Sequence, residues 1–151
     1  MRKVYADSAV FLNAADPPDI AIFHLVQKLS FNSLVKSIRL PSRSQENESF
    51  NNQRAVSIGW GGVSSGLPRF LQYGSFRVRN DCGFREWQIC TKGEGLTDLR
   101  GGDSGGPLFI VENGEPTLIG VNVFIVNGLV GSTRVSKFLQ FINDVTGIPI
   151  R

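Results

Sequence analysis

The chain has 151 residues, 41% of them hydrophobic and 19% charged, with a formal net charge of +3. This size and apolar content suffice for one globular domain with its own core. The basic residues are dispersed, and their densest group (Arg77, Arg79 and Arg85) favours a solvated face over a nucleic-acid groove. No run approaches the roughly 18 apolar residues of a membrane span. We therefore expect neither nucleic acid nor a membrane as a partner.

The N-terminal third offers one clear strand and one clear loop. Residues 1–19 lack the long apolar centre followed by small residues that is typical of a secretory signal. Residues 20–26 (IAIFHLV) follow the turn-forming AADPPD and predict a strand. Residues 42–54 are polar and predict a surface loop, which carries an Asn-x-Ser glycosylation sequence at Asn47.

The middle of the chain contains a glycine-bracketed tryptophan and two cysteines. The strand-like AVSI leads into GWG, where we interpret Trp60 as a core residue. Cys82 and Cys90 enclose CGFREWQIC, a spacing that suits a short loop closed by a disulfide and lacks the CxxC pairs of a zinc site. We predict neither a metal nor a cofactor.

The C-terminal third has the clearest local architecture. The apolar runs PLFIV, TLIGVNVFIV and LVGSTRV are separated by turns that contain Asn113-Gly114 and Asn127-Gly128. Asn-Gly between apolar runs is the strongest short-range hairpin signal, so these residues predict a three-stranded antiparallel meander. The following VSKFLQFINDVTG has helical spacing of its apolar residues and a glycine at its end, which predicts a C-terminal helix stopped by Gly147.

The stretch LRGGDSGGPL, residues 99–108, places Ser104 in a glycine-bent loop directly before the meander. Its GDSGGP core resembles the nucleophile motif of the trypsin/chymotrypsin family of serine endopeptidases. Three further segments are similar to family segments in the family's order: DIAI at 19–22, GWG at 59–61 and TRV at 133–135. Cys82 and Cys90 fall where the family has a disulfide, and residues 120–124 look most like arthropod digestive members.

The resemblance implies an all-β fold: a trypsin-like antiparallel β-barrel followed by a C-terminal α-helix. It also implies a single incomplete domain, in which residues 1–58 are a remnant of the first barrel plus a linker. Residues 59–151 are then the complete second barrel and the helix. Because nothing before Asp19 resembles the family's histidine segment, we expect most of the first barrel to be missing.

The same resemblance assigns roles to individual residues. Ser104 is the nucleophile, Asp19 is the triad aspartate, and the backbone N–H groups of Gly102 and Ser104 form the oxyanion hole. The implied activity is hydrolysis of peptide bonds in a protein or peptide substrate outside the cell, without a cofactor. The general base is missing, because the one histidine, His24, aligns beyond the triad aspartate at a position where family residues vary. Asp103 likewise lacks its family partner, an α-ammonium, so we expect its loop to relax or its carboxylate to find another cation.

The specificity pocket departs from the family pattern. Asp98 aligns with the aspartate that attracts Arg or Lys in trypsin-like members, but Arg100 replaces a cysteine and is placed to neutralise it. Val123, Phe124 and Ile125 stand where Ser-Trp-Gly is usual, and Ile125 is expected to narrow the entrance.

Two interpretations remain open. One is an endopeptidase whose upstream part is missing from these residues, so that the chain alone is inactive. The other is a non-catalytic serine protease homologue that binds a protease, an inhibitor or a surface ligand. The partners implied are a protein or peptide substrate, a protease inhibitor and the missing N-terminal segment.

Overall fold

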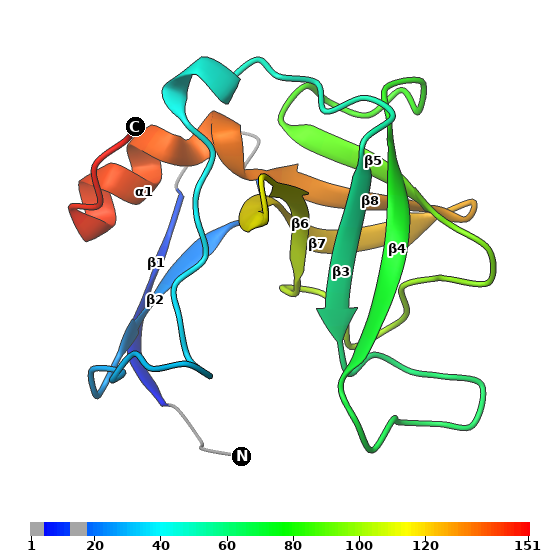
Figure 1. Cartoon of the computed structure of the whole chain (residues 1–151), viewed down its shortest axis with the longest axis horizontal. Coiled ribbons are helices and arrows are strands. Elements are labelled where there is room, and N and C mark those ends of the chain that lie inside the picture. The colour runs from blue at the N-terminus through cyan, green and yellow to red at the C-terminus, as the bar shows by residue number, and fades with distance from the viewer. Residues whose placement is uncertain (1–4, 13–17) are drawn as a thin grey trace.

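The computed structural model describes residues 5–12 and 18–151, and its main body is a closed antiparallel β-barrel (Figure 1). The strands neighbour one another in the order β3-β4-β5-β8-β7-β6, and β3 pairs with β6 to close the barrel. They are β3 (Arg54–Gly59), β4 (Gln72–Arg79), β5 (Gln88–Gly93), β6 (Pro107–Glu112), β7 (Glu115–Val126) and β8 (Leu129–Arg134). The predicted all-β class is confirmed. Because the barrel includes β3, the predicted boundary between residues 58 and 59 falls inside a barrel strand.

The predicted three-stranded meander is formed by β6, β7 and β8. Both of its turns have positive φ at the two central residues: 53° and 81° at Asn113 and Gly114, and 52° and 72° at Asn127 and Gly128. A type I′ turn requires φ above zero at both positions, which asparagine and glycine tolerate best. The two Asn-Gly pairs therefore produce both hairpins as predicted, and they fix the register of β7 against its neighbours.

The barrel interior is filled by alternate side chains of the strands. The larger buried cluster comprises Phe50, Ala55, Val78, Ile89, Leu108, Ile110 and Ile119. Phe50 comes from the segment 42–54, which the sequence predicts to be a surface loop, yet its side chain is only 1% exposed. The prediction is wrong at this residue: burial of one phenylalanine contributes about 1.5–3 kcal/mol, enough to draw a polar segment onto the barrel.

The predicted helix lies close to the C-terminal end of the sequence. A 3-10 turn, η2 (Val135–Phe138), leads into α1 (Leu139–Thr146). Gly147 has φ 71° and donates its N–H to the Asn143 carbonyl oxygen at 2.7 Å, which is the left-handed helix stop that glycine favours. In the part of the chain that the structure describes, no helix is long and apolar enough to cross a membrane.

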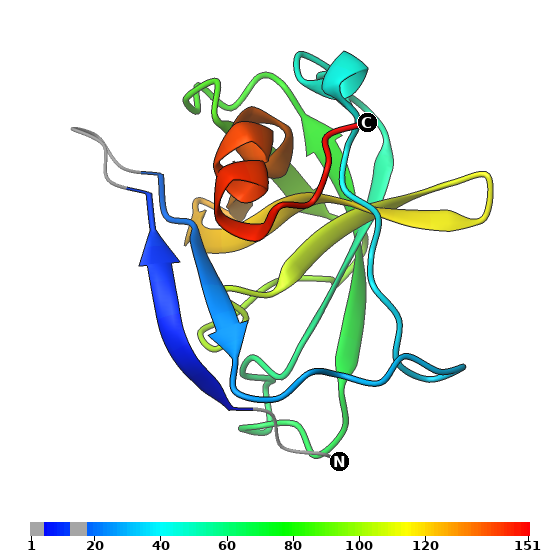
Figure 2. The same cartoon turned by 90° about the vertical axis from the view of Figure 1, so that its left-hand side faces the viewer.

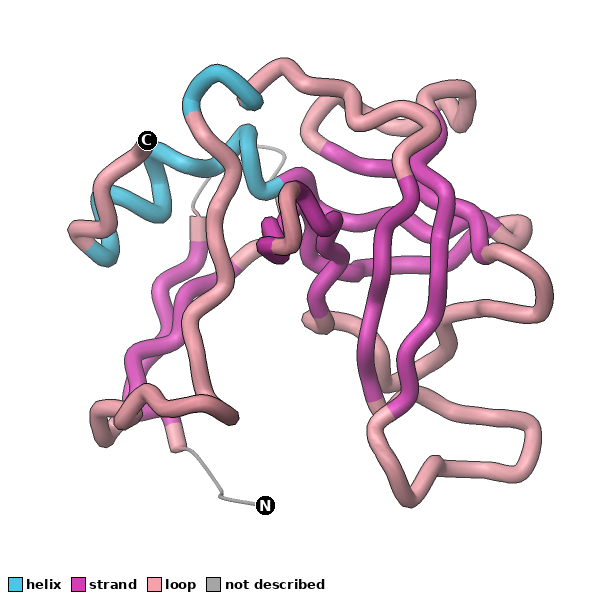
Figure 3. The backbone as a smooth tube through the Cα atoms, viewed as in Figure 1, coloured by secondary structure: helices cyan, strands magenta, loops and turns pink. Residues whose placement is uncertain are grey.

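The N-terminal residues form a separate two-stranded sheet outside the barrel (Figure 2). β1 (Ala6–Phe11) pairs with β2 (Ala21–Leu25) in antiparallel register. A long loop segment then runs from this sheet to the barrel, as the tube drawing shows (Figure 3). Along it, Arg39 forms a parallel bridge with Thr117 of β7. The segment also includes the short 3-10 helix η1 (Arg43–Gln45).

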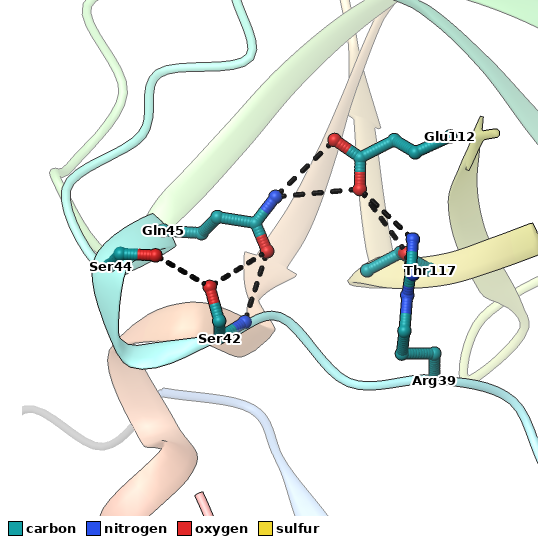
Figure 4. A network of polar contacts seen from close by, with 6 residues as sticks. All are labelled: Arg39, Ser42, Ser44, Gln45, Glu112 and Thr117. Carbon is teal, nitrogen blue, oxygen red and sulfur yellow. Dashed lines mark hydrogen bonds and ion pairs between the residues drawn. The ribbon is translucent and has the colours of Figure 1, made fainter. Parts of the chain in front are cut away.

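Polar contacts fasten this segment to the β6–β7 hairpin (Figure 4). Arg39 donates from Nε to Thr117 Oγ1 at 2.8 Å and forms an ion pair with Glu112 at 3.2 Å. Gln45 donates from Nε2 to the same carboxylate at 3.3 Å and accepts the Ser42 N–H at 3.0 Å. The route of the connecting segment is therefore defined by specific polar pairs on the barrel.

Candidate active site

The loop that carries Ser104 is attached to β7 by a pair of backbone hydrogen bonds. The Gly105 N–H donates to the Asn122 carbonyl at 2.8 Å, and the Asn122 N–H donates to the Gly106 carbonyl at 2.9 Å. Ser104 lies between the bent glycines of this loop and is exposed. The loop is thus held by a barrel strand while its serine faces solvent.

Ser104 and Gly102 present unused backbone donors at the tip of the loop. Gly102 has φ +102°, a conformation that a side chain strongly disfavours. Within residues 5–12 and 18–151, the N–H groups of Gly102 and Ser104 form no hydrogen bond with protein. The Ser104 hydroxyl donates to the Val123 carbonyl oxygen at 3.2 Å. A carbonyl can accept this hydrogen bond but cannot take up the proton.

Asp103 is stabilised by backbone donors, whereas the sequence predicts a cation or a relaxed loop. Its carboxylate accepts the Gly61 N–H at 2.7 Å and the Arg100 N–H at 3.0 Å. A Cβ atom added at Gly59 or Gly61 would overlap the carboxylate oxygens. Hydrogen bonds to a charged acceptor are among the stronger ones in proteins, and they compensate part of the cost of removing the carboxylate from water. The expectation of a cation partner is not met by the described residues.

The glycines of the GWG segment are therefore what allows its backbone to approach the Asp103 carboxylate. Trp60, interpreted from the sequence as a core residue, is 46% exposed, and that interpretation is wrong. The backbone between Gly59 and Gly61 wraps the Asp103 carboxylate closely, which leaves the Trp60 side chain on the outer side. Nothing in the sequence around Trp60 indicates that its side chain is exposed.

Asn122, a buried polar residue next to the Ser104 loop, was not predicted from the sequence to belong to the site. Asn122 is 3% exposed, and it donates from Nδ2 to Ser57 Oγ at 2.8 Å while accepting from Ser132 Oγ at 3.1 Å. The three side chains link β3, β7 and β8 inside the barrel. Because Asn122 also holds Gly105 and Gly106 through its backbone, the network stiffens the strand to which the Ser104 loop is attached. An asparagine within the apolar run TLIGVNVFIV is the only signal that could have indicated it.

The structure brings the Asp19 segment to the same pair of strands. The Asp19 carbonyl accepts a hydrogen bond from Thr133 Oγ1 at 2.9 Å. Thr133 pairs with Val121, which lies close along β7 to the Val123 that contacts Ser104. Asp19 itself is exposed. His24 is also exposed and lies on β2 opposite Ser8, in the sheet outside the barrel.

Ser104 lies on a cavity of about 180 Å³ that includes part of the predicted specificity pocket. Its lining residues are Leu99, Arg100, Gly101, Asp103, Ser104, Asn122, Val123, Phe124, Ile125 and Val130. The predicted Val123, Phe124 and Ile125 are therefore brought together with Ser104. Asp98 is placed in a neighbouring cavity of about 350 Å³, together with Tyr73 and Thr97.

Cys82 and Cys90 form a disulfide, as the sequence predicts. The loop between them carries Phe84, whose ring packs against Phe124 with 5.2 Å between centroids. The disulfide loop thus supports one wall of the cavity beside Ser104.

Comparison with known proteins gives the family. The family model described as Trypsin matches residues 2–142. This chain belongs to the trypsin family. Serine protease 1 of Drosophila melanogaster is 35% identical over an alignment of 135 residues, which covers 80% of this chain and 50% of that protein. Chymotrypsin-2 of Vespa crabro is 34% identical over 82% of this chain and 60% of that protein.

The solved structures agree with this assignment. The structure of HL collagenase superposes with a TM-score of 0.78 at 26% identity, over 97% of this chain and 70% of that one. The predicted trypsin-like fold is therefore confirmed. The chain spans about half the length of the Drosophila relative that it matches. Members of the trypsin family are typically secreted and act on proteins.

Proposed function

We propose that this chain carries the nucleophile and the oxyanion-binding groups of an extracellular serine endopeptidase. The observation that carries the proposal is the exposed Ser104 beside a cavity, with the N–H groups of Gly102 and Ser104 unbonded at the same loop tip. In peptide hydrolysis, the Ser104 oxygen attacks the substrate carbonyl carbon and the carbonyl oxygen becomes an oxyanion. The two N–H groups are the donors for that charge, each contributing about 3–4 kcal/mol by analogy with other enzymes. Asp19 would hold the histidine that takes the serine proton.

These residues do not supply that histidine. His24 lies exposed on β2, and the Ser104 hydroxyl is hydrogen-bonded to a carbonyl oxygen. A serine hydroxyl without a base is a poor nucleophile near neutral pH, and loss of a triad member lowers the rate by on the order of 10⁴ to 10⁶. We therefore expect the 151-residue chain alone to be inactive. A base must come from outside these residues if Ser104 is to act.

Labelling with a fluorophosphonate probe tests the role of Ser104. The 151-residue chain should show no appreciable labelling in the time that an active trypsin-family protease needs for complete reaction. The protein translated from the whole transcript should be labelled stoichiometrically when an in-frame histidine segment precedes Met1. The matched Ser104→Ala variant should abolish that labelling, as judged by intact mass. Rapid labelling of the 151-residue chain at Ser104 would contradict the proposal that these residues lack a base for Ser104.

The alternative is a non-catalytic homologue that binds a protease, an inhibitor or a surface ligand. The hydrogen bond from Ser104 to Val123 favours it, because the hydroxyl is held by an acceptor that cannot activate it. The reading frame upstream of Met1 separates the two. A segment that carries a histidine before Asp19 favours the endopeptidase. Without one, or with no labelling of the longer protein, the binding function is preferred.

A further inference from the structure

The polar segment before β3 carries one acceptor sequence for an N-linked sugar. Asn47, Glu48 and Ser49 form the only Asn-x-Ser/Thr triplet in the 151 residues. In a secreted protein such a triplet is an acceptor when it lies on the surface. We propose that Asn47 is N-glycosylated and that its glycan stands apart from Ser104 and leaves that site accessible. The inference rests on the extracellular location in the proposed function and adds a modification site to it.

The amide nitrogen of Asn47 is available for the sugar. Asn47 is exposed, and its Oδ1 accepts a hydrogen bond from Lys137 Nζ at 2.7 Å. Its Nδ2 forms no hydrogen bond with the residues that the structure describes. Because the sugar is attached at Nδ2, the modification removes no hydrogen bond of the fold, and Oδ1 keeps its contact with Lys137. By contrast, the amide of Asn122 is buried and bonded at both polar atoms.

The backbone on either side of Asn47 is bound to the barrel. Ser136 Oγ donates to the Glu46 carbonyl oxygen at 3.2 Å, and the Arg134 guanidinium donates to the Glu48 carbonyl oxygen at 2.9 Å. A little further along the chain, the side chain of Phe50 is buried in the core. The turn is therefore fixed before and after Asn47, while Asn47 itself stays exposed between the two contacts.

There is open space for a sugar beside Asn47. Asn47 lines a cavity of about 270 Å³ together with Glu46, Arg79 and Lys137. Charged side chains at such a surface offer donors and acceptors to the hydroxyl groups of a sugar. Within the described part of the chain, this cavity shares no lining residue with the cavity beside Ser104. A glycan at Asn47 therefore has room without entering the candidate active site.

Asn47 and the Ser104 loop belong to opposite ends of β3. The helix η1, just before Asn47, lies at the end of the barrel where β3 begins (Figure 1). The other end of β3 leads into Gly61, whose N–H binds the carboxylate of Asp103, the neighbour of Ser104. A strand of six residues spans roughly 17–20 Å. The glycan is thus attached well away from the loop that carries Ser104.

The transfer forms one bond and breaks one. The sugar donor is an oligosaccharide carried on a polyprenyl diphosphate. Asn47 Nδ2 bonds to C1 of the first sugar and gives up one proton. The bond from C1 to the diphosphate oxygen breaks, and the diphosphate leaves with the bonding electrons. Ser49 supplies the hydroxyl that the acceptor sequence requires, and in the folded chain its Oγ accepts the Asn51 N–H at 3.2 Å.

Expression through the secretory pathway tests the acceptor site. The 151-residue chain is produced in cultured mammalian cells behind a removable signal peptide. Intact masses of the secreted and cell-associated chain are measured before and after treatment with a peptide N-glycosidase. We expect the added mass of one glycan, which the treatment removes and which Asn47→Gln and Ser49→Ala both abolish. Ser49→Thr should keep the glycan, and so should the matched control Asn51→Gln, which lies outside the triplet.

The absence of a glycan from both fractions would overturn the inference, and so would a glycan mapped to another asparagine, such as Asn80. The longer protein used for fluorophosphonate labelling should carry the same glycan. If it does not, the inference fails together with the extracellular location, while labelling still decides the role of Ser104. Removal of the glycan should leave the rate of that labelling unchanged. A rate that rises on removal would contradict the separation of the glycan from Ser104, and a glycosylated protein that is not labelled would contradict only the proposed function.

Discussion

The barrel buries aromatic side chains that the N-terminal sheet leaves exposed. Phe76 of β4 is 1% exposed, whereas Phe11 of β1 and Phe23 of β2 are 70% and 62% exposed. The barrel strands close on themselves, so every strand has two neighbours and an enclosed interior. β1 and β2 pair only with each other among the described residues, and a lone two-stranded sheet is marginal in water. The loops of the candidate site are therefore built on the part of the molecule that supports itself.

The largest expected effect compares one substitution in the two regions. Phe76→Ala removes a buried ring from the barrel and should lower the free energy of unfolding by about 3–5 kcal/mol. Phe23→Ala removes an exposed ring from β2 and should change it by less than about 0.5 kcal/mol. Urea unfolding of the 151-residue chain, followed by tryptophan fluorescence, measures both.

A similar loss of unfolding free energy in the two variants would contradict the difference between the barrel and the N-terminal sheet. It would mean that the β2 face is covered in solution, for instance by a second copy of the chain. The unfolding midpoint of the unsubstituted chain would then rise with protein concentration. A midpoint independent of concentration would mean instead that Phe23 is buried within a single chain.

The sequence was most informative where one residue pair determines the backbone. Asn113-Gly114 and Asn127-Gly128 predicted the two hairpins because a type I′ turn depends on the φ angles of those residues alone. Gly147 predicted the helix end for the same reason. Such features are local, so no knowledge of the rest of the fold is needed to recognise them.

The sequence was least informative where distant segments meet. Trp60 looked like a core residue, yet its position is decided by the Asp103 carboxylate, which belongs to another loop. Asp98 is near Ser104 in sequence, but the two residues border different cavities. The roles of Ser104, Asp19 and Gly102 stay predictions, because they require the chemistry of a whole site.

An intermediate effect is expected where two loops of the barrel meet. Gly61→Ala places a methyl group where the Asp103 carboxylate lies, and it should destabilise the chain by about 2 kcal/mol. Gly101→Ala is the matched control, since no atom lies within 4 Å of a Cβ there, and it should be nearly neutral. In an Asp103→Gly background the penalty of Gly61→Ala should fall by at least half, as a double-mutant cycle in urea would show. An unchanged penalty would mean that the methyl group clashes with something other than the carboxylate.

The smallest expected effect lies at the joint between the two regions, where Arg39 meets Glu112. Both side chains are partly exposed, at 31% and 33%, so solvent weakens their attraction. A cycle of Arg39→Met and Glu112→Gln should give a coupling energy of about 0.5–1 kcal/mol that decreases as salt is added. Thr117 and Gln45 share the same carboxylate, so the single Glu112→Gln variant should cost more than Arg39→Met. A coupling near zero would show that the backbone bridge between Arg39 and Thr117 is enough to hold the connecting segment on the barrel.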